Sequence, residues 1–183
     1  AELNRRMILA KKDTKKNQSI LNWYNKKPEF WDRHPEPPKA TILFNYYIRT
    51  RPRHIYNPSN YYYADNYYGV APINGAPLEA AFAILNSSAV AIELQECSRR
   101  QGNGLQKLQL FEYREAWVPS IKIFSEDHIS RLSNLGKALA SESIMNTKLV
   151  ANIDTIIYEA SGCYSQLEPS KLADNIALYW GRN

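Results

Sequence analysis

Three arginines alternate within a stretch of the chain that is dense in tyrosine. Arg49, Arg51 and Arg53 lie inside Thr41–Ile73, and eight of the 13 tyrosines of the chain fall between Tyr46 and Tyr68. Residues two apart on an extended chain share a face, so we expect the three guanidiniums to project together. Guanidiniums beside aromatic rings bind phosphate and stack on bases, which indicates an anion-binding surface. The tyrosines alone are equally well explained as strand formers, half buried on a sheet.

Aromatic and β-branched residues around these arginines predict a small sheet. We expect a strand over residues 41–48, with the arginines at its end or in a loop because Pro52 lacks a backbone donor. The sequence of residues 57–60 has turn chemistry, and a second aromatic strand pair is expected at about residues 61–64 and 67–72.

From Pro77 the apolar residues follow a helical period instead. The polar residues 86–88 are expected to break this segment into two helices and to cap the second one, which would end near Arg99–Arg100. Residues 101–104 then form a flexible turn, and residues 105–118 alternate enough to predict another strand.

The rest of the chain is expected to be helical, over residues 125–140, about 147–161 and 169–180. Ser125 is placed to cap the first of these helices, and Gly162 to end the second. The predicted fold class is therefore α+β: a small mixed or antiparallel aromatic-rich sheet in the N-terminal half, packed with helices, and a helical C-terminal third.

The chain is expected to divide into three regions with unequal charge. Residues 1–40 form a basic helix and a Pro-rich linker, residues 41–124 an α+β core, and residues 125–183 a helical C-terminal region. Residues 1–53 carry 13 Lys/Arg against 5 Asp/Glu, whereas residues 54–183 carry 10 against 13. A basic first third indicates a polyanionic partner, either nucleic acid or an anionic membrane surface.

Several classes of protein are excluded by what the sequence lacks. It has no apolar run of the roughly 18 residues that a membrane span needs, and no signal-peptide pattern, so a cytoplasmic protein is expected. Cys97 and Cys163 are expected to be buried free thiols. The three histidines are far apart, and no metal site is expected.

The motifs of common enzyme classes are also missing. There is no phosphate loop, nucleophile elbow or zinc-protease motif, and Gly102 and Gly104 are not preceded by a predicted strand, as a dinucleotide fold requires. Glu93 and Glu96 share a helical face with arginines nearby, which favours an ion-paired surface over an acid–base pair. We therefore expect no catalytic, cofactor-binding or metal-binding residues in this chain, and interpret it as a binding module.

Four features in a fixed order carry a family resemblance. They are an aromatic, basic strand region ending in Asp65–Tyr68, the helical segment Leu85–Ser88, the segment Arg99–Leu105 that leads to Pro119, and the helical segment Ile153–Tyr158. Together they resemble the C-terminal target-recognition domain of TaqI-type adenine DNA methyltransferases, including forms fused to restriction endonucleases. The start of the chain at Ala1, without an initiator Met, favours a fragment of a longer protein.

The resemblance implies a domain that docks double-stranded DNA, reads the recognition sequence and holds the duplex while the target adenine is flipped out. The parent would be an S-adenosylmethionine-dependent adenine methyltransferase of a bacterial-type restriction–modification system. Its catalytic domain would hold the cofactor and lie upstream in the same chain, as the fragment's second partner. Residues 57–60 read Asn-Pro-Ser-Asn and so depart from the family's catalytic Asn-Pro-Pro-Tyr/Phe motif.

Carried over by position, the resemblance implies two groups of DNA-contacting residues. A basic run near the N-terminus would add further phosphate contacts. The groups are Arg49, Arg51, Arg53, Tyr46 and Tyr47; then Arg99, Arg100 and Asn103; the basic run supplies Lys11, Lys12, Lys15 and Lys16. One alternative is a protein-interaction domain that uses the Tyr/Arg-rich surface. Another is an RNA-binding sheet, although the chain lacks the usual aromatic signature of such sheets.

Overall fold

Two small antiparallel sheets and five α-helices form the part of the chain that the structure describes. The structure is a computed structural model that describes residues 39–72 and 75–162. These residues belong to one compact unit that begins at Lys39. The elements are β1 (Ile42–Asn45), β2 (Tyr47–Ile48), β3 (His54–Tyr56), β4 (Tyr67–Val70), α4 (Leu78–Leu85), α5 (Ser88–Glu96), β5 (Arg99–Gly102), β6 (Leu105–Lys107), α6 (Leu110–Glu115), the short 3-10 helix η1 (Ile121–Ile123), α7 (Glu126–Ala140) and α8 (Thr147–Ala160). The predicted α+β class is confirmed.

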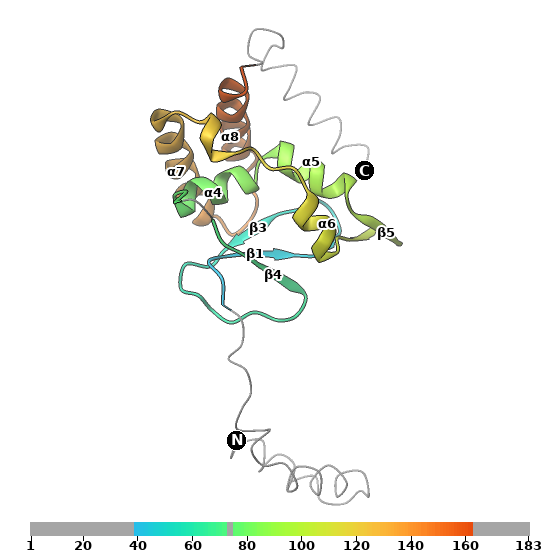
Figure 1. Cartoon of the computed structure of the whole chain (residues 1–183). Helices are drawn as coiled ribbons and strands as arrows, with labels where there is room; N and C mark the ends of the chain where they lie inside the picture. Colours follow the sequence, from blue (N-terminus) through green and yellow to red (C-terminus); the bar gives the residue numbers. More distant parts are fainter. Residues whose placement is uncertain (1–38, 73–74, 163–183) are drawn as a thin grey trace, which may run out of the picture. The chain divides into compact units, whose positions relative to one another are not determined.

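Strand β1 is the middle strand of the first sheet, between β3 and β4 (Figure 1). Ile42 and Phe44 alternate onto one face of the sheet, and both are completely buried. Ile42 joins a core formed with α4, α7 and α8, whereas Phe44 joins a second core with residues of α5. The sheet therefore underlies both groups of helices.

The strand predicted over residues 41–48 is in fact two strands that belong to different sheets. The chain bends at Tyr46, where the Asn45 side chain accepts a hydrogen bond from the backbone N–H of Tyr47 at 2.9 Å. Asn favours such local bonds at the expense of a continuous strand. Beyond the bend, β2 pairs with β6, and β6 pairs with β5. Ile48 of β2 is buried in the core beside α5.

Of the strand pair predicted at residues 61–64 and 67–72, the second strand is confirmed as β4 (Tyr67–Val70), and the first strand is wrong. Only β4 forms there, and it pairs with β1, while Tyr62 makes an isolated bridge with Lys39. The other neighbour of β1 is β3, which the sequence pattern did not predict because Pro52 and two turn-forming residues flank its three residues. Tertiary pairing with a buried central strand, and not local propensity, makes β3 a strand.

The strand predicted over residues 105–118 is confirmed only for β6. The chain then forms helix α6, which starts with a reciprocal capping box between Gln109 and Glu112. The helix predicted to end near Arg99–Arg100 is shorter than expected. Helix α5 ends at Glu96, and residues Arg99–Gly102 form strand β5.

The break between α4 and α5 is confirmed, with the predicted cap in place. Ser87 accepts a hydrogen bond from the Val90 backbone N–H at 3.3 Å. The predicted start of α7 and the predicted end of α8 are confirmed as well. Ser125 caps the N-terminus of α7, and Gly162 follows the C-terminus of α8 with a φ of 71°. The helix predicted over residues 169–180, the basic helix and linker before Lys39, and Cys163 lie outside the described residues.

Helices α4, α7 and α8 pack together on one core. Their buried side chains form a single cluster that includes Ala80, Phe82, Leu132, Leu139, Ile153 and Ile156. Helix α7 approaches α4 so closely that a Cβ added to Gly136 would lie 2.0 Å from the carbonyl oxygen of Glu79. Described residues of the predicted regions 41–124 and 125–183 therefore share one hydrophobic core.

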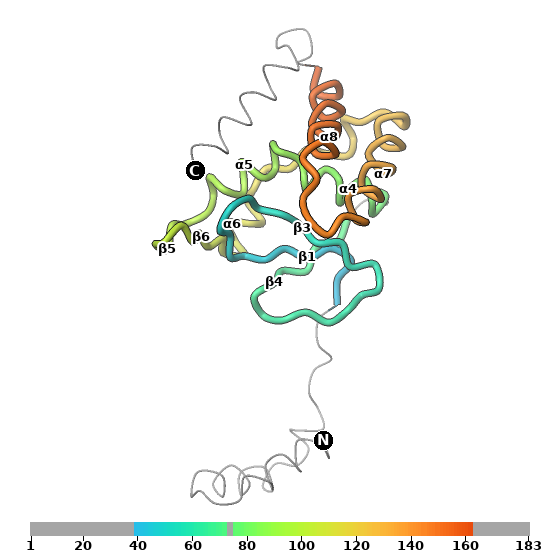
Figure 2. The backbone as a smooth tube through the Cα atoms, turned by 180° about the vertical axis from the view of Figure 1, so that it is seen from behind, coloured from blue at the N-terminus to red at the C-terminus, as the bar shows by residue number. Residues whose placement is uncertain are grey.

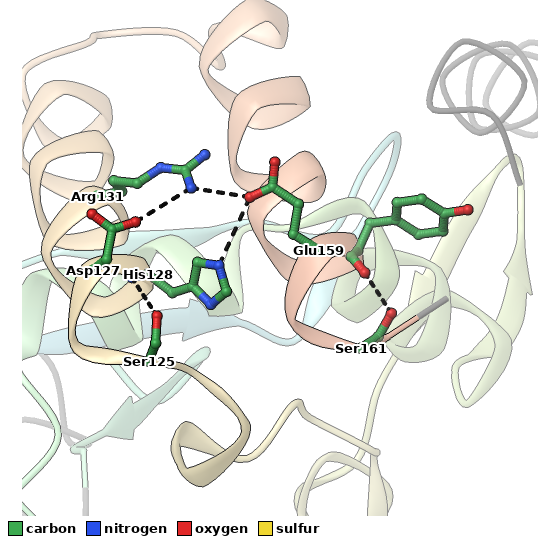
Figure 3. Close-up of polar contacts among 7 residues, drawn as sticks. Ser125, Asp127, His128, Arg131, Glu159 and Ser161 are labelled. Carbon is green, nitrogen blue, oxygen red and sulfur yellow. Dashed lines mark hydrogen bonds and ion pairs between the residues drawn. The ribbon is translucent and has the colours of Figure 1, made fainter. Parts of the chain in front are cut away.

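Polar side chains also join α7 to α8, as Figure 3 shows. Arg131 lies between Asp127 of its own helix and Glu159 of α8, at 3.5 and 3.0 Å. The His128 ring lies 3.8 Å from the same Glu159 carboxylate. These contacts lie on the helical side of the fold, and none of the predicted DNA-binding residues between Lys39 and Gly162 takes part in them.

Candidate nucleic-acid interface

The arginine segment forms the loop between β2 and β3, in agreement with the prediction that it lies at a strand end. Arg49 and Arg53 are exposed, whereas Arg51 is half buried beside the buried Pro52. The Arg51 guanidinium donates hydrogen bonds to Ser88 Oγ at 3.1 Å and to the Asn86 carbonyl oxygen at 3.4 Å. The expectation that all three arginines project together is therefore wrong for Arg51, because the loop bends and turns this side chain toward the α4–α5 junction.

A buried acid on α8 completes this anchor. Asp154 Oδ1 accepts a hydrogen bond from the Ser88 backbone N–H at 2.7 Å. Burial raises the pKa of the Asp154 carboxyl, and the bonds from Ser88 and the charge of Arg51 oppose that rise. Burial likewise lowers the pKa of Arg51, with Asp154 opposing it. A guanidinium keeps its proton even so, and Arg51 supplies the positive charge facing Asp154.

The far end of the loop is fixed by a buried histidine. The His54 backbone N–H donates to the Asn86 side chain at 2.9 Å, and the Asn86 amide donates to the Phe82 carbonyl at 3.0 Å. The His54 ring is hydrogen-bonded through Nε2 to the Tyr113 hydroxyl at 2.8 Å and lies beside the Phe44 ring. Burial lowers the pKa of His54 to about 3, so the ring is neutral at physiological pH. The loop is thus held at its middle, through Arg51, and at its far end, through His54.

Strands β5 and β6 form a ribbon that reaches beyond the rest of the described chain (Figure 1, Figure 2). Every residue of β5 is exposed, as are Asn103 and Gly104. Gly102 pairs with Leu105, so Asn103 and Gly104 form a two-residue turn, with φ values of 50° and 71°. Positive φ at both positions is what a type I′ hairpin turn requires, and Asn-Gly is its preferred sequence. The segment predicted as a flexible turn is therefore a defined hairpin.

The two arginines of the ribbon point to opposite faces of it. Arg99 pairs with Lys107 and Arg100 with Gln106, and successive residues of a strand alternate between faces. The sequence interpretation had treated this pair as one group. Arg100 lies nearer the tip of the ribbon, with Asn103, and Arg99 lies at its base.

Tyr46 and Tyr47 lie where the first sheet gives way to the second. Their ring centroids are 4.6 Å apart, and Tyr46 also lies 5.2 Å from the ring of Tyr68. The ammonium group of Lys107 lies 5.4 Å from the Tyr46 ring centroid and 5.6 Å from that of Tyr47. Lys107 was absent from the predicted site. The alternation of residues 105–108 could have revealed it, once a hairpin at Asn103–Gly104 was recognised.

Arg99 is held in place by α6. Its Nε donates to Glu112, and its guanidinium lies 5.5 Å from the Phe111 ring centroid. The Glu112 side chain is only 11% exposed, and a hydrogen bond from the Gln109 backbone lowers the pKa of its carboxyl, with Arg99 adding to the effect. Phe111 is a second residue that the sequence interpretation missed, because it placed this segment in a strand.

Strand register brings the arginine loop and the ribbon to the same region. Strand β2 runs antiparallel to β6 with Ile48 opposite Gln106, so the chain leaving β2 at Arg49 heads toward Leu105, next to the ribbon turn. Two strand spacings, about 10 Å, separate β2 from β5. The structure thus brings together Arg49, Tyr46, Tyr47, Arg99, Arg100 and Asn103. Lys11, Lys12, Lys15 and Lys16 lie outside the described residues.

The described residues form neither a candidate metal site nor a membrane-spanning helix. Between residues 39 and 162, with residues 73–74 left aside, no group of three or more His, Cys, Asp or Glu side chains could hold a metal ion. No helix in the same part of the chain has both the length and the apolar character to cross a membrane. Cys97, which was expected to be buried, is only half buried, and burial next to Glu93 raises the pKa of its thiol.

No protein-family model, no curated protein and no solved structure matches this chain.

Proposed function

We propose that this chain is a DNA target-recognition domain that binds double-stranded DNA through the tip of the β5–β6 ribbon and the loop between β2 and β3. It acts by binding and carries out no bond-making chemistry itself. The observation that carries the proposal is the exposed ribbon, which presents cations on both of its faces and an Asn-Gly turn at its tip.

A two-stranded ribbon of this kind has the right dimensions for DNA. The major groove is about 12 Å wide and admits a pair of β-strands. Arg100 can fork onto guanine and Asn103 onto adenine, and each such pair discriminates by about 1–3 kcal/mol. The exposed Arg49 and Arg53 lie on the adjoining loop, where they can neutralise phosphates. Arg51 has the role of holding that loop in place through Ser88.

The proposal extends to the parent protein through the family resemblance. The parent would be a bacterial-type, cytoplasmic, S-adenosylmethionine-dependent adenine methyltransferase of a restriction–modification system. Its catalytic domain would bind the cofactor and take the flipped adenine, while this domain fixes the duplex in register. The four ordered motifs, which include the ribbon segment Arg99–Leu105 and end in the helical segment Ile153–Tyr158, support this part of the proposal.

A salt titration of duplex binding tests the proposal directly. The whole chain and the variant Arg49→Ala/Arg53→Ala/Arg100→Ala are titrated against a mixed-sequence duplex at several salt concentrations. The plot of log affinity against log salt should flatten by about 0.9 for each phosphate contact that the variant loses. The matched control is Lys122→Ala/Lys137→Ala/Lys148→Ala, which removes the same charge from exposed positions on η1, α7 and α8.

The control should bind nearly as the unmodified chain does, because its lysines lie away from the ribbon and loop. Equal losses in the two triple variants would mean that net charge alone drives binding, and the proposed interface would be wrong. The alternative function, a protein-interaction domain, predicts weak duplex binding with no difference between the variants. The exposed apolar side chains of Leu110 and Trp117 beside the ribbon are the observation that favours this alternative.

A further inference from the structure

One face of the second sheet presents one aromatic ring and two cations side by side, and a second ring from α6 adjoins them. Register places Tyr47 opposite Lys107 and Lys107 opposite Arg99, so these three side chains leave the sheet on the same face. The Lys107 ammonium lies 5.6 Å from the Tyr47 ring centroid, and the Arg99 guanidinium lies 5.5 Å from that of Phe111. We call Tyr47, Lys107, Arg99 and Phe111 the aromatic–cation row.

The row is open to solvent at both of its ends. Tyr47 is 42% exposed and Phe111 is 55% exposed. The side chain of Arg99 between them is 56% exposed. A single exposed aromatic residue is ordinary on a protein surface, but here two rings flank two cations. Tyr47, Lys107 and Arg99 lie on three paired strands, and Phe111 lies on α6. Across β2, β6 and β5 the spacing is about 5 Å per strand.

Arg99 is oriented in advance for an anion. The Arg99 Nε donates a hydrogen bond to the Glu112 carboxylate. The terminal Nη groups of Arg99 make no hydrogen bond within the part of the chain that the structure describes. Glu112 is itself held by the Gln109 backbone N–H at 2.7 Å, as part of the cap of α6. The guanidinium is thus fixed over the Phe111 ring with its outer fork facing solvent. A fork fixed in this way suits a phosphate oxygen pair.

We infer that the aromatic–cation row binds unpaired nucleotides of single-stranded DNA, with bases stacked on Tyr47 and Phe111 and phosphates on Lys107 and Arg99. Aromatic rings can stack only on base faces that are accessible, and in a duplex those faces are covered by neighbouring bases. The inference rests on the proposed function for the choice of nucleic acid as the partner. It goes beyond that function because the duplex contacts lie at the ribbon tip, whereas the row lies at the ribbon base.

The position of the row suits a strand displaced from a duplex. Arg99 and Lys107 close the base of the ribbon, and Gly102 and Leu105 close its tip. A duplex engaged by the tip would therefore have the row beside it, where a locally opened strand could reach the exposed rings. The row would then favour opened DNA over intact duplex.

Binding of a labelled single strand tests the inference. The probe is a 12-nucleotide oligothymidylate with a central 2-aminopurine, whose fluorescence is quenched when it stacks on an aromatic ring. The whole chain should bind and quench it. The variant Tyr47→Leu/Phe111→Leu keeps apolar bulk but removes the rings, and should lose the quenching and weaken binding about 5- to 150-fold for each stacked base lost. The variant Arg99→Gln/Lys107→Gln should weaken binding and lower its salt dependence.

The matched control is Tyr61→Leu/Tyr62→Leu, which removes two exposed tyrosines from the loop before β4 and should leave quenching unchanged. Quenching that persists in Tyr47→Leu/Phe111→Leu, or a whole chain that does not bind the probe, overturns the inference. Neither result affects the proposed function, because that function is tested by duplex titration of the variant with Arg49, Arg53 and Arg100 replaced. Conversely, duplex binding that is indifferent to those three arginines overturns the proposed function, while loss of quenching in the row variant still supports the row.

Discussion

Arg51 donates a hydrogen bond to the side chain of Ser88 at 3.1 Å, across 37 positions of sequence. This contact joins the loop between β2 and β3 to the first turn of α5. Because Ser88 also donates its backbone N–H to Asp154 on α8, three segments that are distant in the chain meet at one serine. Arg51 points inward and anchors the loop, and its neighbours Arg49 and Arg53 are exposed on that anchored loop.

Replacing Arg51 with Met should therefore destabilise the fold, although it keeps the length of the side chain. The change removes the hydrogen bonds that the half-buried Arg51 donates to Ser88 and Asn86, together with the positive charge that acts on Asp154. We expect a loss of about 1–3 kcal/mol in the free energy of unfolding, measured with urea. Arg53→Met is the matched control and should stay within about 0.5 kcal/mol of the unmodified chain, because Arg53 is exposed. Equal losses in the two variants would contradict the anchoring role.

Stability should fall as the pH drops below about 6.5, because His54 is buried in its neutral form. Its pKa is lowered to about 3 in the folded state, so between these two pH values the unfolded chain binds a proton that the folded chain does not. The contribution of His54 to stability is thus present above pH 6.5 and declines below it, by up to about 1.4 kcal/mol per pH unit.

Urea unfolding of His54→Gln and the unmodified chain at several pH values isolates this contribution. The stability difference between the two proteins should narrow as the pH falls from 6.5 to 4.5. Tyr113→Phe removes the hydroxyl that bonds the ring but keeps the imidazole buried, so it should keep the pH dependence of the unmodified chain. A difference that does not change with pH would mean that His54 becomes accessible to water before the chain unfolds.

Gly136→Ala should be destabilising, which is the opposite of the usual effect of this change in a helix. Ala is favoured over Gly within a helix by about 1 kcal/mol. Here, however, the added Cβ would lie 2.0 Å from the Glu79 carbonyl oxygen, which is backbone and cannot move aside without shifting α4. We expect a net loss of about 1–3 kcal/mol on thermal or urea unfolding. A gain in stability would mean that α4 and α7 are farther apart than the structure places them.

The Asn-Gly turn should control DNA binding independently of the core. Gly104 has a φ of 71°, and a Cβ there would meet nothing within 4 Å, so the whole effect of Gly104→Ala comes from backbone strain. We expect weaker duplex binding together with an almost unchanged unfolding midpoint, because the ribbon lies outside the two cores. Amide exchange of β5 and β6, compared with that of α7, measures the local loosening. Duplex affinity equal to that of the unmodified chain would separate the ribbon from DNA recognition.

Local signals in the sequence predict α4, α5, α7 and α8 but not α6, which falls inside a predicted strand. Ser87 and Ser125 cap helices where their side-chain oxygens predicted caps, and Gly162 follows α8 as expected. These predictions succeeded because capping depends on residues within a few positions of one another. The strands were harder because β3 is defined by its pairing with β1, and no local pattern encodes that pairing.

The candidate site was predicted in its residue types but not in its geometry. The alternation of Arg49, Arg51 and Arg53 indicated a common face, yet the bend of the loop and the buried Asp154 turn the middle residue inward. The Asn103–Gly104 pair is a recognisable hairpin signal, but a regular hairpin would place Lys107 opposite Arg100, and only the register shift between Arg100 and Gly102 brings it opposite Arg99. The position of Arg51 could not be predicted, because its partners come from α5 and α8 and only the folded chain brings them together.

Asp154 lies on α8, near the end of the part of the chain that the structure describes, and its position has a practical consequence for expression work. A shortened protein that stops after Phe124, where composition suggests a boundary, would delete the carboxylate that faces Arg51 and half of the core beneath Ile42. Such a product would keep Arg49, Arg53, Arg99 and Arg100 but would present the loop arginines wrongly. Any minimal version made for co-crystallisation with an oligonucleotide should extend at least through Gly162.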